Sequence, residues 1–163
     1  MEKYSVFNVQ NKNYSCFNIG FLNVNSLRKK LHMLFDFVVG SDLDVLGVAE
    51  SWLTPDVPES FVSMDGYGLV RCDSESGVSK HGVCLYIKRN IKFRFLDEGC
   101  GNVCCVHLVD FDLFIAVVYR PPSNSSDENN SICNFLYDFC DSRELLGLGD
   151  SIFHLFRGMM NIY

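Results

Sequence analysis

The sequence predicts an α/β protein with mixed β-sheets, and three observations lead to this fold class. An apolar segment, an amphipathic helical segment and a second apolar segment follow one another between residues 16 and 50. This order is typical of a parallel βαβ unit with a right-handed crossover. Short apolar segments separated by turn residues follow between residues 66 and 120, as in antiparallel strands. A helical segment and a last apolar strand then lie between residues 131 and 150.

The βαβ unit begins with "CFNIGFLNV", residues 16–24, whose apolar and β-favouring residues predict a buried strand. Ser26 is placed to act as a helix N-cap. The apolar residues after it recur with helical spacing: Leu27, Leu31, Leu34 and Val38. We expect this helix to end near Gly40 and the second strand to be "DVLGVAE", residues 44–50.

The middle of the chain predicts β-structure. Pro55 and Pro58 indicate a loop after the second strand, and "GYGLVRCD", residues 66–73, predicts the next strand. We then expect an antiparallel meander of four strands, which lie within residues 81–89, 92–98, 102–110 and 113–120.

The last part of the expected domain contains a loop, a helix and a strand. Residues 121–130, "PPSNSSDENN", predict a long polar loop. The apolar residues after it share one helical face: Ile132, Phe135, Leu136 and Phe139. The segment "ELLGLGD", residues 144–150, predicts a final strand.

Composition limits the classes of function. The chain has 163 residues, of which 48% are hydrophobic and 21% charged, as expected of one globular domain. Its net charge of -6 argues against binding nucleic acid through bulk positive charge, so we expect any such contact to be local and metal-assisted. Residues 1–15 contain no continuous apolar run typical of a secretory signal, which favours an intracellular protein. No segment is long enough to span a membrane, so no membrane partner is expected.

The chain contains eight cysteines, and none of them forms a C-x-x-C pair typical of zinc sites. Four lie in apolar, strand-like segments and are interpreted as reduced, buried thiols: Cys16, Cys84, Cys104 and Cys105. A disulfide framework is the alternative, and it would require the secretory route.

Several predicted strands end on polar residues, at the edge where α/β proteins commonly bind ligands. The polar residues at these ends are Asn23, Asn25, Glu50, Tyr119, Arg120 and Asp150. Because Mg²⁺ prefers oxygen ligands, Glu50 together with Asn23 could bind this cation.

Five motifs in a fixed order resemble the endonuclease/exonuclease/phosphatase family. They are "LNVNSL", "DVLGVAESWL", "GVSKHGVCLYIKR", "VVYRPPS" and "LLGLGD". Within the family the similarity is greatest to the endonuclease domain that precedes reverse transcriptase in non-LTR retrotransposons, and it runs from about Phe17 to Asp150. The resemblance implies two packed mixed β-sheets flanked by helices, a DNase I-like α/β sandwich that is incomplete at its C-terminus. It divides the chain into an N-terminal extension (1–15), a partial domain (16–150) and an unrelated tail (151–163).

The resemblance also implies roles for the strand-end residues. Glu50 would be the main ligand of Mg²⁺, with Mn²⁺ as an alternative cation, and Asn23 would help to hold the metal and the scissile phosphate. Tyr119 would contact that phosphate, and Asp150 would orient or deprotonate the attacking water. The implied reaction cuts one DNA strand and leaves a 3′-hydroxyl, with the metal stabilising the developing charge.

The chain also departs from the family pattern. The family's Gly-Asp is followed by Phe-Asn, whereas here Ile152 stands in place of the asparagine and cannot donate a hydrogen bond to phosphate. The Ser-Asp-His motif expected further on is absent from the 163 residues. A working nuclease and a non-catalytic remnant or binding fragment of a mobile-element protein are therefore both open. Phosphatases acting on inositol phosphates or sphingomyelin fit "ESWL" and "YRPPS" poorly.

Each of these residues also has a purely structural interpretation. Asn23 and Asn25 are common turn residues, and Gly-Asp at Asp150 is a common turn sequence. Glu50 could be a solvated strand end, and Tyr119 could be a rim aromatic. Three histidines outside any partner pattern are interpreted as surface or packing residues: His32, His81 and His107.

Overall fold

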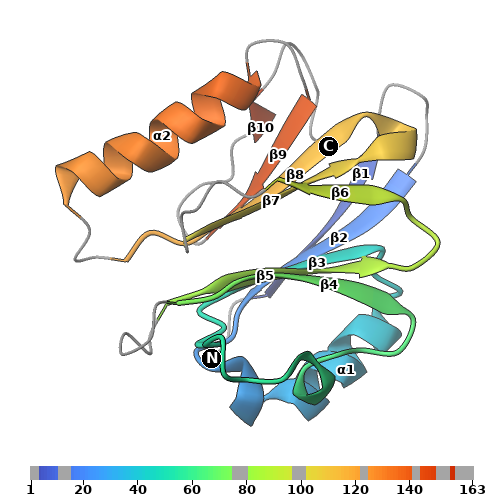
Figure 1. The fold of residues 1–163 in the computed structure, drawn as a ribbon. Coiled ribbons are helices and arrows are strands. Elements are labelled where there is room, and N and C mark those ends of the chain that lie inside the picture. Colours follow the sequence, from blue (N-terminus) through green and yellow to red (C-terminus); the bar gives the residue numbers. More distant parts are fainter. Residues whose placement is uncertain are drawn as a thin grey trace.

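Two five-stranded mixed β-sheets pack face to face, and one helix covers the outer face of each (Figure 1). The helices are α1 (Leu31–Gly40) and α2 (Ser126–Cys140). This arrangement confirms the α/β sandwich with two packed mixed sheets that the family resemblance implies. The computed structural model describes residues 4–10, 16–74, 81–96, 102–121, 125–140, 144–149 and 155–156.

The first sheet, sheet A, has the strand order β1-β2-β3-β5-β4. Its strands are β1 (Tyr4–Gln10), β2 (Cys16–Asn23), β3 (Val45–Ala49), β5 (Val83–Lys88) and β4 (Tyr67–Cys72). Strands β2 and β3 are parallel and are joined through α1, as the expected βαβ unit requires, whereas the other neighbours are antiparallel.

The second sheet, sheet B, has the strand order β10-β9-β8-β7-β6. Its strands are β10 (Leu155–Phe156), β9 (Glu144–Leu148), β8 (Leu113–Val118), β7 (Val103–Leu108) and β6 (Phe93–Leu96). Only the β8–β9 pair is parallel. Strand β5 was expected to start a meander with the next three strands, and this is wrong because the chain crosses from sheet A to sheet B between β5 and β6.

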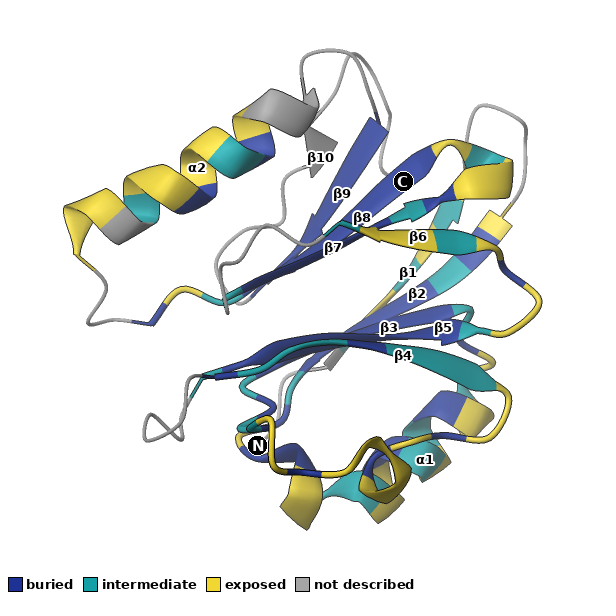
Figure 2. Ribbon diagram, viewed as in Figure 1, coloured by how far each residue is buried: buried dark blue, intermediate teal, exposed yellow. Residues whose placement is uncertain are grey.

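Three apolar clusters lie between these four layers. In strands that are buried on both faces, successive side chains belong to different clusters. In β3, Val45 and Ala49 face the other sheet, whereas Leu46 and Val48 face α1. Figure 2 shows the central strands of both sheets buried, with exposed residues on the helices, the loops and the edge strand β6. The third cluster lies between sheet B and α2 and includes Ile132.

The first helix begins differently from the sequence expectation. Ser26 makes no side-chain capping hydrogen bond, and a short 3₁₀ helix (Leu27–Lys29) precedes α1. The φ angle of Ser26 is 86°, and its N–H donates to the Glu50 carbonyl at 2.9 Å. Ser26 therefore joins the end of β2 to the end of β3 instead of capping the helix.

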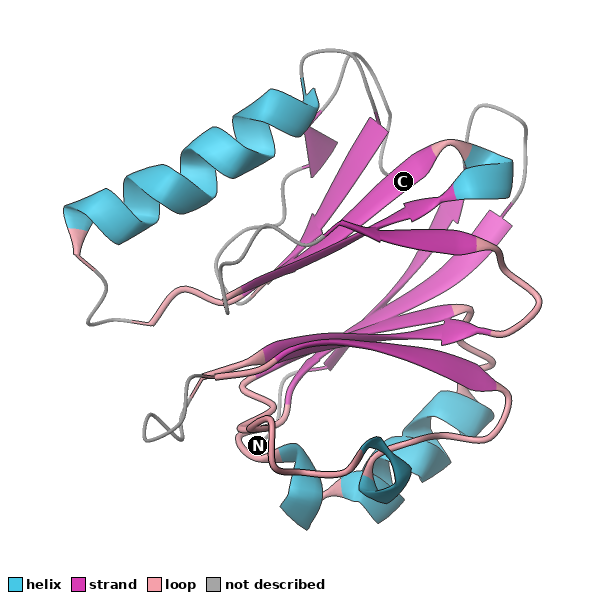
Figure 3. Cartoon of the chain, viewed as in Figure 1, coloured by secondary structure: helices cyan, strands magenta, loops and turns pink. Residues whose placement is uncertain are grey.

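The second helix begins earlier than expected. Residues 121–130 were expected to be a loop, but α2 starts at Ser126. Figure 3 shows the long helix beside sheet B. Acidic residues in a first helical turn interact favourably with the helix dipole, and the sequence has Asp127 and Glu128 there. Ile132 and Leu136 are buried against sheet B as predicted, whereas the side chain of Phe139 lies outside the described part of the chain.

Two strands lie in ranges that were expected to be outside the domain. β1 pairs with β2 within residues 4–10, and β10 pairs with β9 at residues 155–156. No helix among the described residues is long and apolar enough to cross a membrane.

The cysteine prediction holds for three residues and fails for one. Cys84, Cys104 and Cys105 are buried free thiols. Cys16 is exposed because it lies at the first position of β2, at the end of the β1–β2 pair.

Candidate functional site

The polar residues that follow β2 and β3 are in direct contact. The Asn23 amide Nδ2 donates to Glu50 Oε1 at 2.7 Å, and Asn23 Oδ1 accepts the Asn25 backbone N–H at 3.2 Å. This proximity follows from the parallel pairing of the two strands, which places Asn23 opposite Ala49, the residue before Glu50. Asn23 thus orients one oxygen of a half-buried carboxylate.

The backbone around this pair adopts an uncommon conformation. Four non-glycine residues have φ between 44° and 86°: Asn25, Ser26, Glu50 and Trp52. Left-handed backbone in non-glycine residues is uncommon and tends to cluster at functional sites. Hydrogen bonds between the two turns hold it here, because Ser26 N–H donates to the Glu50 carbonyl and Leu27 N–H donates to the Ser51 carbonyl, both at 2.9 Å.

A second segment, residues 81–82, fixes the other side of the Glu50 turn. Ser51 N–H donates to the Gly82 carbonyl at 3.0 Å, and Trp52 N–H donates to the His81 carbonyl at 2.9 Å. Gly82 has φ 90°, and a Cβ on it would lie 2.7 Å from Ser51 Oγ. Only glycine therefore fits this position without strain.

The loop after Glu50 is held against β4. The guanidinium of Arg71 donates to the carbonyls of Thr54 (3.1 Å) and Val57 (2.9 Å), and it also pairs with Asp73. Within the loop, the Thr54 hydroxyl donates to the carboxylate of Asp56, which holds the pKa of Asp56 below its ordinary value.

Tyr119 directly follows β8 in sheet B and contacts sheet A through His81. The two ring centroids are 6.0 Å apart with an interplanar angle of 62°, an edge-on contact. The Tyr119 N–H donates to the Asn102 carbonyl at 2.9 Å, which ties Tyr119 to the residue before β7. Tyr119 therefore lies at the end of the sandwich that carries Asn23 and Glu50.

Asp150 lies outside the described residues. The residue before it, Gly149, is described and follows β9. A Cβ on Gly149 would lie 2.7 Å from the Val118 carbonyl oxygen, so β9 ends beside the residue that precedes Tyr119. The roles expected for Asn23, Glu50, Tyr119 and Asp150 stay predictions.

From the sequence, His81 is interpreted as a surface or packing residue, and in the structure its ring packs against Tyr119 in this region. It lies within the quoted segment "GVSKHGVCLYIKR", but its partners are Trp52 and Tyr119, which are far away in the sequence. The one local signal in the sequence is the adjacent Gly82, since a glycine next to a strand often marks a close backbone approach, and here a Cβ would lie 2.7 Å from Ser51 Oγ.

The side-chain oxygens of Glu50 and Asn23 are of the type that a hard divalent cation binds, and in this structure Asn23 directs its amide Nδ2 to Glu50 while its Oδ1 accepts the Asn25 N–H. Mg²⁺ commonly binds one or two protein oxygen ligands and keeps waters and substrate phosphate as the others. In the part of the chain that the structure describes, no group of three or more His, Cys, Asp or Glu residues could hold a metal ion. The carboxylate of Glu50 and the amide oxygen of Asn23 suit Mg²⁺ or Mn²⁺ better than zinc, which prefers four nitrogen and sulfur ligands.

Three solved structures show the same fold. An AP endonuclease from Leishmania major has a TM-score of 0.64 and 19% identity, with 80% of this chain and 53% of that chain covered. A 3′ phosphatase from Neisseria, solved with a product DNA hairpin, has a TM-score of 0.62 and 19% identity, with coverage of 82% and 56%. An AP endonuclease from Archaeoglobus fulgidus has a TM-score of 0.60 and 18% identity, with coverage of 81% and 56%.

These similarities define a class of fold. The chain has the DNase I-like fold of AP endonucleases and related exonucleases and phosphatases, and it spans a little more than half the length of these structures. No protein-family model and no curated protein matches the sequence.

Proposed function

We propose that this chain carries the metal-binding part of a phosphodiester hydrolase that acts on DNA with Mg²⁺. The observation that carries the proposal is the contact between Asn23 Nδ2 and Glu50 Oε1, 2.7 Å, at the end of the sandwich where Tyr119 also lies. The similarity of the fold to DNA-processing enzymes supports the choice of substrate.

Each residue has a distinct part in the proposed reaction. Glu50 and Asn23 would hold the cation, which would polarise a phosphoryl oxygen and stabilise the developing charge. The Tyr119 hydroxyl would donate a hydrogen bond to a phosphate oxygen. Asp150 would orient the attacking water or accept its proton, while the bond between phosphorus and the 3′ oxygen breaks and leaves a 3′-hydroxyl.

We further propose that the chain derives from the endonuclease of a non-LTR retrotransposon. The support is the order of its sequence motifs, above all "ESWL" at residues 50–53 and "YRPPS" at residues 119–123. Other branches of the family fit these two motifs poorly.

A second candidate function is a fragment that binds metal or DNA without turnover. Ile152 favours it, because an apolar side chain replaces an asparagine that would contact phosphate. The two candidates share the metal site and differ only in catalysis.

Metal binding by Glu50 tests both candidates. Mn²⁺ would be titrated into the protein and followed by electron paramagnetic resonance. We expect Glu50→Gln and Asn23→Ala to weaken Mn²⁺ binding by about tenfold or more, the scale seen when support of a metal ligand is lost.

Glu59→Gln is the matched control. Glu59 is an exposed carboxylate in a short 3₁₀ helix (Glu59–Phe61) of the loop after Glu50. Its replacement should leave Mn²⁺ affinity unchanged. Equal Mn²⁺ affinity in the wild-type chain and the Glu50→Gln variant would refute the proposed metal site.

A further inference from the structure

The two sheets approach each other closely where β4 faces β7. Cα atoms of the two strands come within 8 Å of each other, whereas stacked sheets are ordinarily about 10 Å apart. The Cys104 thiol of β7 lies 3.9 Å from the Val70 carbonyl oxygen of β4 and donates a weak hydrogen bond to it. A cysteine side chain of sheet B therefore reaches the backbone of sheet A.

Cys72 lies on the same face of β4 as Val70, because residues two positions apart in a strand share a face. Val70 and Cys104 belong to the apolar cluster between the sheets, and Cys72 packs against that cluster. The side chains of Cys72 and Cys104 are hydrogen bonded, and this bond together with burial raises the pKa of the Cys104 thiol. Two free thiols from different sheets thus face each other.

Two neighbouring cysteines point away from this pair. Cys84 of β5 belongs to the cluster between sheet A and α1, and Cys105 of β7 belongs to the cluster between sheet B and α2. Both side chains therefore lie on the outer faces of their sheets. Among the cysteines that the structure describes, Cys104 is the one that faces Cys72 across the sandwich.

The two facing thiols differ in their access to solvent. Cys72 is half-buried, whereas Cys104 is fully buried. Since oxidation of a thiol depends on its exposure, a small oxidant reaches Cys72 first. Cys104 is enclosed and can react only with a group that Cys72 presents to it. One cysteine is thus placed to be oxidised and the other to resolve the oxidised form.

We propose that Cys72 and Cys104 form a disulfide between the two sheets when the protein meets a hydroperoxide such as hydrogen peroxide. The Cys72 sulfur attacks the peroxide, the O–O bond breaks, and a sulfenic acid and one water form. The Cys104 sulfur then attacks the sulfenic sulfur, the S–S bond forms, and the hydroxyl leaves as a second water with the Cys104 proton. The two thiols are oxidised by two electrons in total, and the peroxide is reduced to water.

The disulfide would join the two sides of the candidate site. Cys72 is paired with Val83, which directly follows residues 81–82, whose carbonyls hold the turn with the candidate carboxylate. Cys104 is paired with Val117 of β8, two residues before the candidate tyrosine. Oxidation therefore ties the strand ends of sheet A to those of sheet B. The bond itself does not depend on the proposed function.

The first measurement is a peptide map of the full chain under non-reducing conditions after treatment with hydrogen peroxide. Trypsin separates the two cysteines, because Lys88 and Arg94 lie between them. We expect a linked pair of peptides in the wild-type chain, its loss on reduction, and its absence in Cys72→Ser and Cys104→Ala. In Cys104→Ala the sulfenic acid at Cys72 lacks its resolving thiol, so dimedone should label Cys72 more strongly than in the wild type.

Cys100→Ala and Cys105→Ala are the matched controls. Both cysteines share the tryptic peptide of Cys104, residues 95–120, so a link to either of them would have the same mass before fragmentation. Both variants should retain the link to Cys72. A link from Cys72 to any other cysteine, or a Cys72 that stays unlinked after peroxide treatment, would overturn the proposal.

The second measurement is the melting temperature of the oxidised and the reduced chain. A disulfide that fits the native fold should raise it by about 4–15 °C, because the cross-link restricts the unfolded chain. Peroxide should cause no such rise in Cys72→Ser, whose reduced form should melt like the reduced wild type. A linked chain that melts at the same or a lower temperature than the reduced chain would overturn the proposal, since the bond would then require a distorted fold.

Discussion

Gly47 of β3 and Val117 of β8 are in contact between the two sheets. A Cβ on Gly47 would lie 2.6 Å from Val117 Cγ2 and 2.9 Å from Leu148 Cδ1. Gly47 lies three residues before Glu50, and Val117 lies two residues before Tyr119. This close approach of β3 and β8 therefore holds together the strand ends that carry the candidate site.

We predict that Gly47→Ala destabilises the fold. Val117 is β-branched and fully buried, so its methyl group cannot move aside without displacing its neighbours. Overpacking of a buried position costs about 1–3 kcal/mol, and urea unfolding would measure it.

Gly40→Ala is the control for this prediction. Gly40 is the last residue of α1, and a Cβ on it would meet no atom within 4 Å. Its replacement should leave stability unchanged or raise it by up to about 1 kcal/mol, because alanine favours helix. Equal effects of the two substitutions would contradict the close approach of the sheets.

We predict that Arg71 holds the loop after Glu50 in its folded conformation. Its side chain is only 14% exposed and donates to two loop carbonyls and to Asp73. Arg71→Ala should lower the free energy of unfolding by about 1.5–3 kcal/mol for each charged hydrogen bond that water does not replace. It should also speed amide hydrogen exchange at Val57. Hydrogen exchange followed by mass spectrometry would locate the change.

Arg71→Lys separates charge from geometry. Lysine keeps the positive charge but lacks the planar fork that reaches both carbonyls and the carboxylate at once. We expect amide hydrogen exchange at Val57 to be almost as fast in this variant as in Arg71→Ala. Protection of the loop by lysine would mean that charge alone is sufficient.

The sequence predicted the strands well because most of them are continuous apolar segments that are buried on both faces. β3, β5 and β8 are examples. It also predicted the parallel β2–β3 pair, because a helical segment lies between them. The sheet to which β5 belongs could not be predicted. In both β5 and β7 every second side chain faces the core between the sheets, and their pairing is set by contacts distant in sequence.

The candidate site was predictable where it depends on strand ends and unpredictable where it depends on packing. Asn23, Glu50 and Tyr119 each follow a recognisable apolar segment. His81 reaches the site only because the two sheets bring it against Tyr119. The role of Ser26 was missed for a similar reason, since its N–H is bonded to the Glu50 carbonyl across the βαβ unit.

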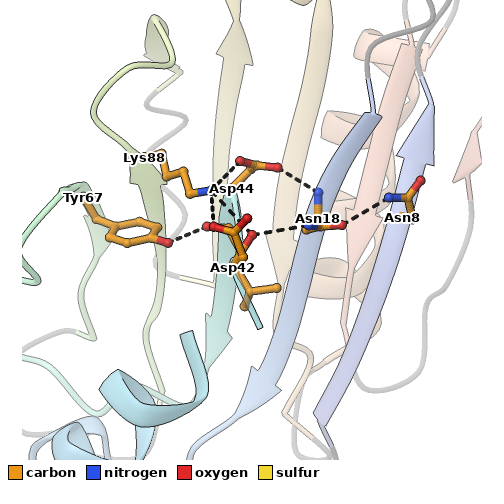
Figure 4. Close-up of polar contacts among 7 residues, drawn as sticks. Asn8, Asn18, Asp42, Asp44, Tyr67 and Lys88 are labelled. Carbon is orange, nitrogen blue, oxygen red and sulfur yellow. Dashed lines mark hydrogen bonds and ion pairs between the residues drawn. The ribbon is translucent and has the colours of Figure 1, made fainter. Parts of the chain in front are cut away.

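We predict that two aspartates bonded to the same lysine differ in their effect on stability. Lys88 Nζ lies 2.9 Å from a carboxylate oxygen of both Asp42 and Asp44, at the opposite ends of β3 and β5 from Glu50 (Figure 4). Asp44 is 23% exposed and also accepts the Asn18 backbone N–H, whereas Asp42 is 84% exposed. Asp44→Asn should lower the free energy of unfolding by about 1–3 kcal/mol, and Asp42→Asn should lower it by less than about 1 kcal/mol.

Urea unfolding at two salt concentrations would check this pair of variants. Salt should reduce the small contribution of Asp42 further, because exposed charges are screened, and should leave that of Asp44 nearly unchanged. Equal losses of stability in the two variants would contradict the role that we assign to burial.

We predict that the thiols of the native protein fall into two classes of reactivity. Cys16 and Cys133 are exposed and should be alkylated quickly. Burial raises the pKa of the Cys84 thiol, and a hydrogen bond with Cys72 together with burial raises the pKa of Cys104. Because only the thiolate reacts, alkylation of Cys84 and Cys104 in the native protein should remain slow when the pH is raised from about 7 to about 9.

Alkylation mapped by mass spectrometry would separate these positions. In urea all the cysteines should react at similar rates, which serves as the control. Fast alkylation of Cys84 in the native protein would show that its strand opens readily or that it is not buried.

The last prediction concerns turnover. We expect the 163-residue chain to nick supercoiled plasmid DNA only at trace rates in Mg²⁺, even where it binds the metal. Catalytic groups that act together lose far more than the sum of their separate contributions when one is missing, and the proposed family resemblance would require an asparagine where this chain has Ile152. Glu50→Ala and Asp150→Ala should show the same trace rate as the wild-type chain, which would assign it to contaminating nuclease. Robust nicking that both substitutions abolish would contradict this prediction, because these residues would then suffice for a working catalytic centre.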